Sequence, residues 1–467
     1  MLKGRTTIEL KNVVTGEVEK YDDENMITKA ISDFFSHNIE GMLFNINGAP
    51  NDFNGNMLPL ARNGIGGILL FADPLVEDEN AYFAPSANLC TGYASNDVNS
   101  TANIMRGSLN LTESVKIDKG YKFVWDFATS QANGTISAVA LTHKWGGIGY
   151  MGDTYDNTNK RWHIKEESIG TDANKVTAYI NAVEVSFEGN YIISIGIDTS
   201  NKTIIRKIRK PLRKVGINDT MLENQVEVLE EHAIEPVNFI MSNPSNNSGN
   251  YDFFDGRDGY WYGFWHDSNS SGNASIKWIK IKKSDFTFTE GTWTINNAAI
   301  YAAGYRAGYN TGPSRNVYSV LLNGYLYMIS NDKRSVYKIN VNNAADVTRI
   351  DLGFTSSFSS SGASYNRGLT YMVSMGDWII GSDYRISSDD KVYKTANTMP
   401  FSYTNTPLFE YGPFLFSFGA YNYSSYSMRK MLFLRTPYLV TINNLDTSVI
   451  KTADKTMKIT YTITEVE

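Results

Sequence analysis

Three aspartates lie close together near the middle of the chain, in Tyr251-Asp252-Phe253-Phe254-Asp255-Gly256-Arg257-Asp258-Gly259. Carboxylates can gather a calcium ion, and a pair of them can hydrolyse a glycosidic bond. The intervals between these aspartates differ from the alternate spacing of a calcium loop, however, and Asp-Gly is a common turn sequence. The segment therefore favours a turn, and Asp255 with Asp258 remains the minor alternative of a catalytic pair.

Aromatic residues with polar neighbours form a more suggestive pattern, in a chain of 467 residues with 29 Tyr, 23 Phe and 8 Trp. Rings flanked by polar groups offer apolar faces and hydrogen bonds together, which suits stacking against sugar rings. The alternative is that these rings fill a β-core, as we expect for Trp261 and Trp278. The candidate ligand-binding residues are Tyr260, Trp265 and His266; Tyr305, Arg306 and Tyr309; and Tyr421, Tyr423 and Tyr426.

Other kinds of chemical site have no support in the sequence. The five histidines are scattered, and no HExxH pair, phosphate-binding loop or GxSxG motif occurs. The single cysteine, Cys90, excludes an intramolecular disulfide framework and a CxxC motif. We therefore expect no cofactor, no metal and no enzymatic activity.

The charge balance argues against nucleic acid as a partner, because the net charge is −6 and the pI is near 5.6. Residues 202–214 are rich in Lys and Arg, whereas residues 219–235 carry acids and neither Lys nor Arg. This switch is interpreted as a solvated connector over 201–239, with a nucleic-acid stripe as the alternative. The first residues lack an apolar signal region and residues 65–72 are too short to span a bilayer, which predicts cytoplasmic synthesis without membrane insertion.

Alternating and apolar runs predict a mainly β protein. Residues 6–21 favour a hairpin, and the apolar spacing from Asn25 to His37 predicts one short helix, capped by Asp23 or Asn25. Short strands separated by turn residues predict a β-sandwich domain over 41–200, after an N-terminal hairpin and helix over 1–40.

A loose repeat follows residue 240, in which a Gly-initiated aromatic strand precedes a second strand. Its units begin at Gly259, Gly324 and Gly376, with a more diverged pair at 414–418 and 431–434. We expect a β-propeller-like, aromatic-rich domain over 240–437, with a second β-sandwich as the alternative. Residues 438–467 are expected to add C-terminal strands that pack on the scaffold.

Several segments resemble structural proteins from tails of phages and prophages of Gram-positive bacteria, described as tail fibre, minor tail or receptor-binding proteins. The most specific segment is Trp125-Asp126-Phe127-Ala128-Thr129-Ser130-Gln131-Ala132-Asn133-Gly134-Thr135-Ile136. The others are residues 6–10 with 25–30, 65–71, 106–110, 441–445 and 451–461.

This resemblance implies a component of a phage or tailocin tail, with scaffold at both ends of the chain and a variable centre that meets the host. We expect a non-enzymatic tail-tip adhesin for host cell-surface polysaccharide, made in the host cytoplasm, with other virion tail proteins as partners and a homotrimer as the oligomer. The alternatives are a purely structural baseplate or tail subunit and, with less support, a virion-associated polysaccharide depolymerase.

Overall fold

In the computed structural model, most of the described residues belong to β-strands. The described residues are 2–31, 64–81, 83–86, 90–147, 161–168, 181–186, 191–198, 200–209, 228–240, 250–266, 272–301, 319–357, 372–394, 408–411, 414–417, 427–433 and 438–465. A mainly β fold, as predicted, is confirmed. Within these residues, no helix has the length and apolar character needed to cross a membrane.

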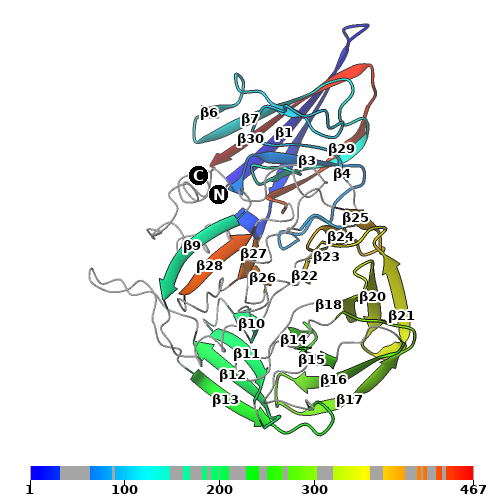
Figure 1. The fold of residues 1–467 in the computed structure, drawn as a ribbon. Coiled ribbons are helices and arrows are strands. Elements are labelled where there is room, and N and C mark those ends of the chain that lie inside the picture. Colours follow the sequence, from blue (N-terminus) through cyan, green and yellow to red (C-terminus); the bar gives the residue numbers. More distant parts are fainter. Residues whose placement is uncertain are drawn as a thin grey trace, which may run out of the picture.

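One large antiparallel sheet combines the N-terminal part of the chain with its C-terminal strands (Figure 1). The order in this ten-stranded sheet is β4-β3-β8-β29-β2-β1-β30-β7-β5, and β6 pairs with β7. The strands are β1 (Leu2–Asn12), β2 (Val18–Ile27), β3 (Gly67–Phe71), β4 (Cys90–Ala94), β5 (Ser108–Leu109), β6 (Val115–Ile117), β7 (Gly120–Phe127), β8 (Gly134–Thr142), β29 (Thr441–Lys451) and β30 (Lys455–Glu465).

The two edges of this sheet approach each other, so the sheet is nearly closed and barrel-like. Tyr93 of β4 donates from its backbone N–H to the Met105 carbonyl at 2.9 Å and accepts from the Gly107 N–H at 2.8 Å, beside β5. The enclosed core contains fully buried side chains such as Trp125, Phe127 and Tyr461. A β-sandwich was expected over 41–200. The structure instead has one curved sheet here, because the strands near both ends of the chain hydrogen-bond in one continuous ladder.

The helix expected from Asn25 to His37 begins later than its apolar spacing predicts. Residues as far as Ile27 belong to β2, where Asn25 pairs with Gly4 and Met26 pairs with Ile442. Helical backbone is described at 29–31, after Thr28, whose Oγ1 accepts from the Ala30 N–H at 3.2 Å. Neither proposed cap therefore has that role, and residues 32–37 lie outside the described part.

Five four-stranded antiparallel sheets, here named sheets I to V, account for the other strands of the described residues. Sheet I contains β10 (Ala182–Ser186), β11 (Tyr191–Ile197), β12 (Thr203–Arg209) and β13 (Val228–Ile234); sheet II contains β14 (Asn250–Asp255), β15 (Tyr260–His266), β16 (Ala274–Lys282) and β17 (Phe288–Ile295). Sheet III contains β18 (Ser319–Leu322), β19 (Tyr325–Ile329), β20 (Ser335–Asn340) and β21 (Asn343–Asp351); sheet IV contains β22 (Met372–Met375), β23 (Trp378–Gly381), β24 (Tyr384–Ile386) and β25 (Val392–Lys394). Sheet V contains β26 (Leu408–Tyr411), β27 (Phe414–Ser417), β28 (Ser427–Phe433) and, on its edge, β9 (Arg161–Ser168).

Figure 1 shows these sheets following one another around a common centre. The first strands of neighbouring sheets contact each other, from β10 to β14, β18, β22 and β26 in turn. Separate apolar clusters fill the spaces between sheets I and II, II and III, and III and IV. Sheets I to IV are therefore stabilised by burying apolar side chains against their neighbours.

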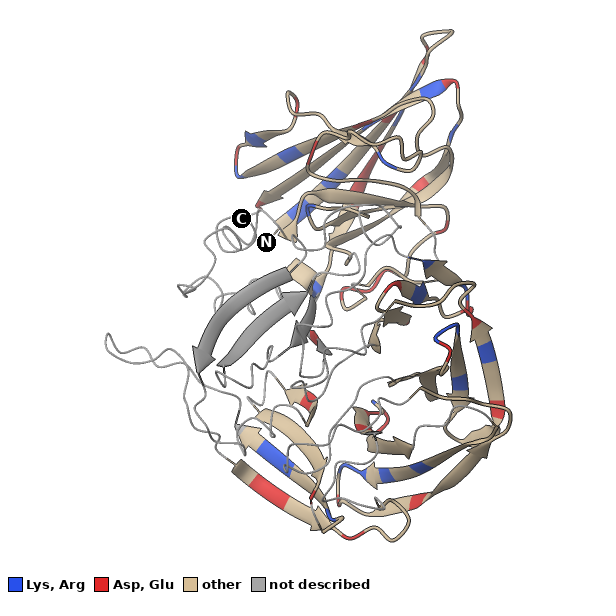
Figure 2. Cartoon of the chain, in the orientation of Figure 1, with Lys and Arg blue, Asp and Glu red and all other residues tan. Residues whose placement is uncertain are grey.

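The segment expected as a charged connector over 201–239 contributes two strands to sheet I. Strands β12 and β13 are paired, so the basic run lies opposite the acidic run, and Figure 2 shows the blue band of β12 beside the red band of β13. Arg206 Nε lies 2.6 Å from Glu231 Oε2, and Lys207 Nζ lies 3.1 Å from Glu230 Oε1. Cross-strand ion pairing, which stabilises antiparallel strands, explains the charge switch.

The loose repeat corresponds to successive strands within a sheet. Its units at Gly259 and Gly324 form the second and third strands of sheets II and III. In both, a lysine of the third strand lies over a tyrosine of the second, at 4.2 Å for Lys280 over Tyr260 and 4.9 Å for Lys338 over Tyr325. Sheet I has the same arrangement in Lys207 over Tyr191, at 4.8 Å, so the repeat includes a sheet that precedes residue 240.

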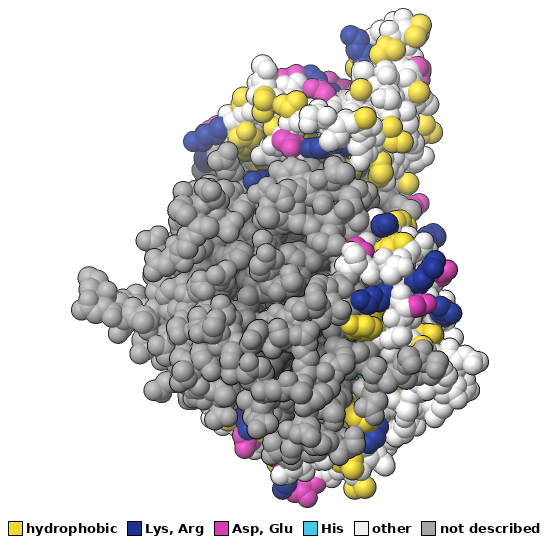
Figure 3. Space-filling view, viewed as in Figure 1, with side chains coloured by type: hydrophobic (Ala, Val, Ile, Leu, Met, Phe, Trp, Pro, Cys, Tyr) yellow, Lys and Arg dark blue, Asp and Glu magenta, His cyan; other side chains and the backbone are white. Residues whose placement is uncertain are grey.

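The hairpin of β1 and β2 projects from the ten-stranded sheet (Figure 1), and Figure 3 shows hydrophobic side chains at the surface of this end. The exposed fractions are 55% for Val13, 84% for Val14 and 56% for Val18. Gly16 adopts a φ of +75° in the turn, where glycine is favoured.

Candidate functional site

Three of the sequence-predicted ligand residues lie on or near β15. Trp265 and His266 are buried, with exposed fractions of 6% and 5%, and Trp265 belongs to the apolar cluster between sheets I and II. Neither ring therefore offers a free face to a ligand in this structure. Tyr260 is half-buried beneath Lys280. The other candidates, Tyr305, Arg306, Tyr309, Tyr421, Tyr423 and Tyr426, lie outside the described residues.

Asp255 and Asp258 hold the β14–β15 turn, whereas Asp252 is buried within β14. Asp255 Oδ1 accepts from the Arg257 N–H at 2.7 Å, and Asp258 Oδ1 accepts from the Tyr260 N–H at 3.1 Å. Asp258 Oδ2 also accepts from the Tyr262 hydroxyl at 2.6 Å. Within the described ranges, no group of three or more His, Cys, Asp or Glu residues could hold a metal ion. The contacts of Asp255 and Asp258 are those of a turn.

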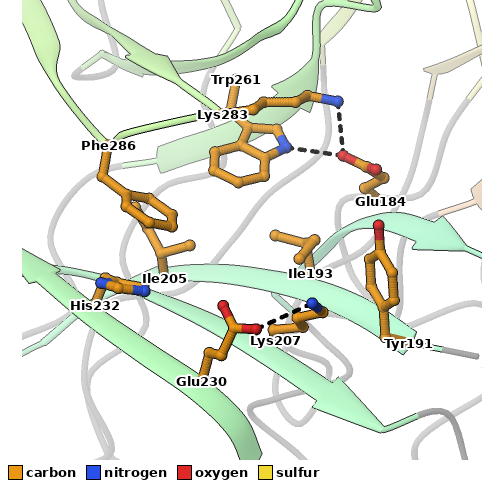
Figure 4. A pocket seen from close by; sticks show the side chains of 10 residues that line it. All are labelled: Glu184, Tyr191, Ile193, Ile205, Lys207, Glu230, His232, Trp261, Lys283 and Phe286. Atoms are coloured by element: carbon orange, nitrogen blue, oxygen red, sulfur yellow. Dashed lines mark hydrogen bonds and ion pairs between the residues drawn. The ribbon is translucent and has the colours of Figure 1, made fainter. Parts of the chain in front are cut away.

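A cleft of about 190 Å³ lies between sheets I and II and combines rings with paired charges (Figure 4). We name it the I–II cleft. Strands β10 to β13 supply one side, while β15 and the β16–β17 turn supply the other. Its lining residues are Glu184, Tyr191, Ile193, Ile205, Lys207, Glu230, His232, Trp261, Lys283 and Phe286.

Three rings from both sheets form a stack along one wall of the I–II cleft. The His232 ring lies 3.9 Å from the Phe286 ring, with an angle of 23° between the planes. Phe286 lies 6.3 Å from Trp261, at 25°. The buried side chains of Ile193 and Ile205 belong to the same apolar cluster as Trp261, and Figure 4 shows them facing these rings across the cleft. The wall thus offers apolar surface next to polar groups.

Two lysine–carboxylate pairs bring charge to the I–II cleft. Glu184 Oε2 accepts from Lys283 Nζ at 2.7 Å and from Trp261 Nε1 at 3.0 Å, which fixes the indole ring. Lys283 also pairs with Asp255 at 2.7 Å. Burial alone would lower the pKa of Lys283, but its hydrogen bonds to Asp255 and Glu184 outweigh burial and raise this pKa, so the ammonium stays charged.

The second pair is formed by Lys207 and Glu230, and Lys207 also lies over the Tyr191 ring. Both residues belong to sheet I, so this pair joins β12 to β13 and does not link sheet I to sheet II. The I–II cleft therefore has one charged pair that crosses it, Glu184 with Lys283, and one pair within sheet I, Lys207 with Glu230.

None of the ten lining residues was a sequence-predicted site residue. One signal in the sequence could have indicated Tyr191 as part of this site. Like Tyr260 and Tyr325, it begins a strand that is followed by a strand containing lysine. Glu184 and Phe286 carry no such local signal, because the fold alone brings them together across about one hundred residues of sequence.

Comparisons with protein-family models and with curated protein sequences give no match. Among solved structures, the chain is similar to the crystal structure of a "putative 6-phosphogluconolactonase" from Bacteroides uniformis, with 11% identity over 94% of this chain and 99% of that chain. The TM-score is 0.21, so this likeness supports no statement about function.

Proposed function

We propose that the protein is a non-enzymatic receptor-binding adhesin of a phage or tailocin tail, and that it binds host cell-surface glycan. The observation that carries this proposal is the I–II cleft, where Trp261, Phe286 and His232 form a stack beside two charged pairs. Sugars have apolar C–H faces and many hydroxyl groups, so they match a site that offers rings and hydrogen-bonding charges together.

Sheets I to V are, in this proposal, the blades of a five-bladed β-propeller. Each is a four-stranded antiparallel sheet, and their first strands are neighbours around the centre. In sheet V the edge strand β9 comes from before β10 in the chain, so the two ends of the ring share one sheet. Propellers protect their sheet edges by this kind of radial repetition.

The ten-stranded sheet is, in the same proposal, the scaffold that attaches to other virion tail proteins. The residues that carry the resemblance to phage tail proteins support this role by their position. Residues 6–10 lie in β1, 125–136 include parts of β7 and β8, and 451–461 include most of β30. A homotrimer would present several glycan sites on one particle and so raise the overall affinity through avidity.

Sedimentation of the labelled full-length protein with host cell envelopes tests the adhesin role. We expect saturable binding that soluble envelope glycan competes away. A folded protein that does not sediment with the envelopes would contradict the proposal.

A second candidate, a purely structural tail subunit, is favoured by the exposed valines at the hairpin tip. Large exposed apolar side chains that gather at one projecting end are typical of surfaces covered by another protein. In this role the tip would contact a neighbouring virion subunit, and the protein would make no receptor contact.

A thiol placed at the tip, together with the envelope experiment, separates the two candidates. Cys90 is buried and its pKa is raised by burial, so it is a poor target for a maleimide. The variant Val14→Cys adds an exposed thiol. If the tip is covered in the particle, Val14→Cys is labelled in the free protein and protected in the assembled tail. Protection without envelope binding would favour the structural role.

A further inference from the structure

We propose that the I–II cleft binds one uncharged pyranose ring and that its two lysine–carboxylate pairs bind the hydroxyl groups of this sugar. This inference rests on the proposed glycan-binding function and names the class of ligand.

The size of the cleft limits the ligand. Its volume of about 190 Å³ is below the roughly 300–1,000 Å³ of sites that enclose drug-sized molecules. A single six-membered ring is therefore a better match than a nucleotide or an oligosaccharide that is buried along its length.

The apolar surface of the cleft suits a ring with one apolar face. Tyr191 and Phe286 are partly exposed rings of the cleft and supply this surface. Trp261 is 4% exposed, stacks on Phe286 and is held by the hydrogen bond from its Nε1 to Glu184, so it supports the wall from within. The buried side chains of Ile193 and Ile205 lie near these rings (Figure 4). Preorganised rings lose little conformational entropy when they bind.

The charge balance of the cleft disfavours an anionic sugar. Among the lining residues, the two lysines Lys207 and Lys283 are each paired with a glutamate, Glu230 and Glu184. Lys283 has a further acidic partner in Asp255. A phosphate or a uronate would meet no excess positive charge, whereas a neutral hydroxyl can donate to a carboxylate and accept from an ammonium.

The equivalent lysine in sheet III has a different kind of partner from Lys207. Lys338, which lies over Tyr325, reaches across to Asp390 in the β24–β25 turn of sheet IV at 2.7 Å. Lys207 instead pairs with Glu230 inside its own sheet. Between sheets III and IV the bridge is thus made by the lysine that lies over the second-strand tyrosine, whereas sheets I and II are bridged by Lys283 with Glu184.

Calorimetric titration of the full-length protein tests the inference. The neutral probes are the methyl glycosides of glucose, galactose, rhamnose and N-acetylglucosamine, and the anionic probes are glucuronate and glycerol phosphate. We expect at least one neutral probe to bind and both anionic probes to fail. Binding of an anionic probe as tight as that of the best neutral probe would overturn the inference, as would the absence of binding by every neutral probe.

Variants at the cleft assign the binding to it. Tyr191→Ala and Lys207→Met should each weaken the best neutral probe about tenfold, which corresponds to about 1.4 kcal/mol. Tyr325→Ala removes the corresponding ring from sheet III and is the matched control, with unchanged affinity. Circular dichroism checks that each variant is folded. Unchanged binding by folded Tyr191→Ala and Lys207→Met proteins would overturn the assignment to this cleft.

The envelope experiment separates this inference from the proposed function. If an anionic envelope polymer competes and a neutral glycan does not, the adhesin role is supported and the inference is overturned. If a neutral glycoside binds the cleft but the protein does not bind envelopes, the ligand class is supported and the adhesin role is overturned.

Discussion

At the scale of single residues, His266 couples the stability of the fold to pH. This side chain lies on β15 with 5% of its surface exposed, and burial lowers its pKa to about 4. An unfolded histidine has a pKa of about 6.5, so between these values the unfolded chain binds a proton that the folded chain does not. The stabilising effect of the neutral ring is complete above the unfolded pKa and is lost as pH falls toward the folded pKa.

We therefore predict that the free energy of unfolding decreases on acidification by up to about 1.4 kcal/mol per pH unit within this window because of His266. Denaturant unfolding at several pH values, for the natural protein and for His266→Phe, measures this contribution. Carboxylates titrate in both proteins and cancel in the difference. Identical pH slopes in the two proteins would contradict the prediction.

At the scale of elements, the pairing of β12 with β13 depends on opposite charges. Arg206 and Glu231 are partners across these strands and remain partly exposed. We predict that Glu231→Lys destabilises the protein by about 0.2–1 kcal/mol, the usual size of such pairs, and that the added change Arg206→Glu restores most of this loss. Thermal unfolding at low and high salt measures it, because salt screens exposed charges. An effect that is independent of salt and not rescued would count against ion pairing.

Local patterns in the sequence predict much of the β-structure. Gly259 and Gly324 precede tyrosine-rich strands, and both adopt a positive φ in the turns that begin them. The helical spacing after Asn25 fails at its first residues because β2 pairs with β1 and β29, and this pairing is fixed by the C-terminal strands. Here tertiary contacts override a local preference.

Local sequence patterns could not predict the I–II cleft either, because tertiary contacts bring its residues together. Its rings come from four different strands or turns of two sheets. Trp261 is buried in the apolar cluster between these sheets, as expected of a core residue. Sheet I itself was divided between a sandwich and a connector, because its ion-paired strands are as charged as a solvated linker. A cross-strand charge pattern becomes recognisable only once the pairing of the strands is known.

At the scale of the whole molecule, a short segment docks the ten-stranded sheet on sheet IV. The Ser86 hydroxyl donates to Asp377 Oδ2 at 2.7 Å, and the Ser86 N–H lies 3.1 Å from Asp377 Oδ1. Nearby, Trp378 Nε1 donates to the Ala84 carbonyl at 3.2 Å. These contacts join residues that are about 290 positions apart in the chain.

We predict that Asp377→Ala lowers stability by about 1–3 kcal/mol, because the buried donors of Ser86 lose their acceptor. Calorimetric unfolding should show the scaffold and the ring of sheets melting less cooperatively. The control is Asp351→Ala, where the carboxylate accepts from the Gly353 N–H in an exposed turn of one sheet. Equal losses in both variants would argue against a docking role for Asp377.

The place where the chain leaves and re-enters the ten-stranded sheet has an evolutionary consequence. Strands β8 and β29 are neighbours, and the Val440 N–H donates to the Leu141 carbonyl at 2.8 Å, so exit and return lie side by side. Recombination on either side of this point could replace residues 143–440 as a cassette while the scaffold ladder is kept. A new insert would have to match the Ser86 contact with Asp377, and the ladder of the ten-stranded sheet would not have to be rebuilt.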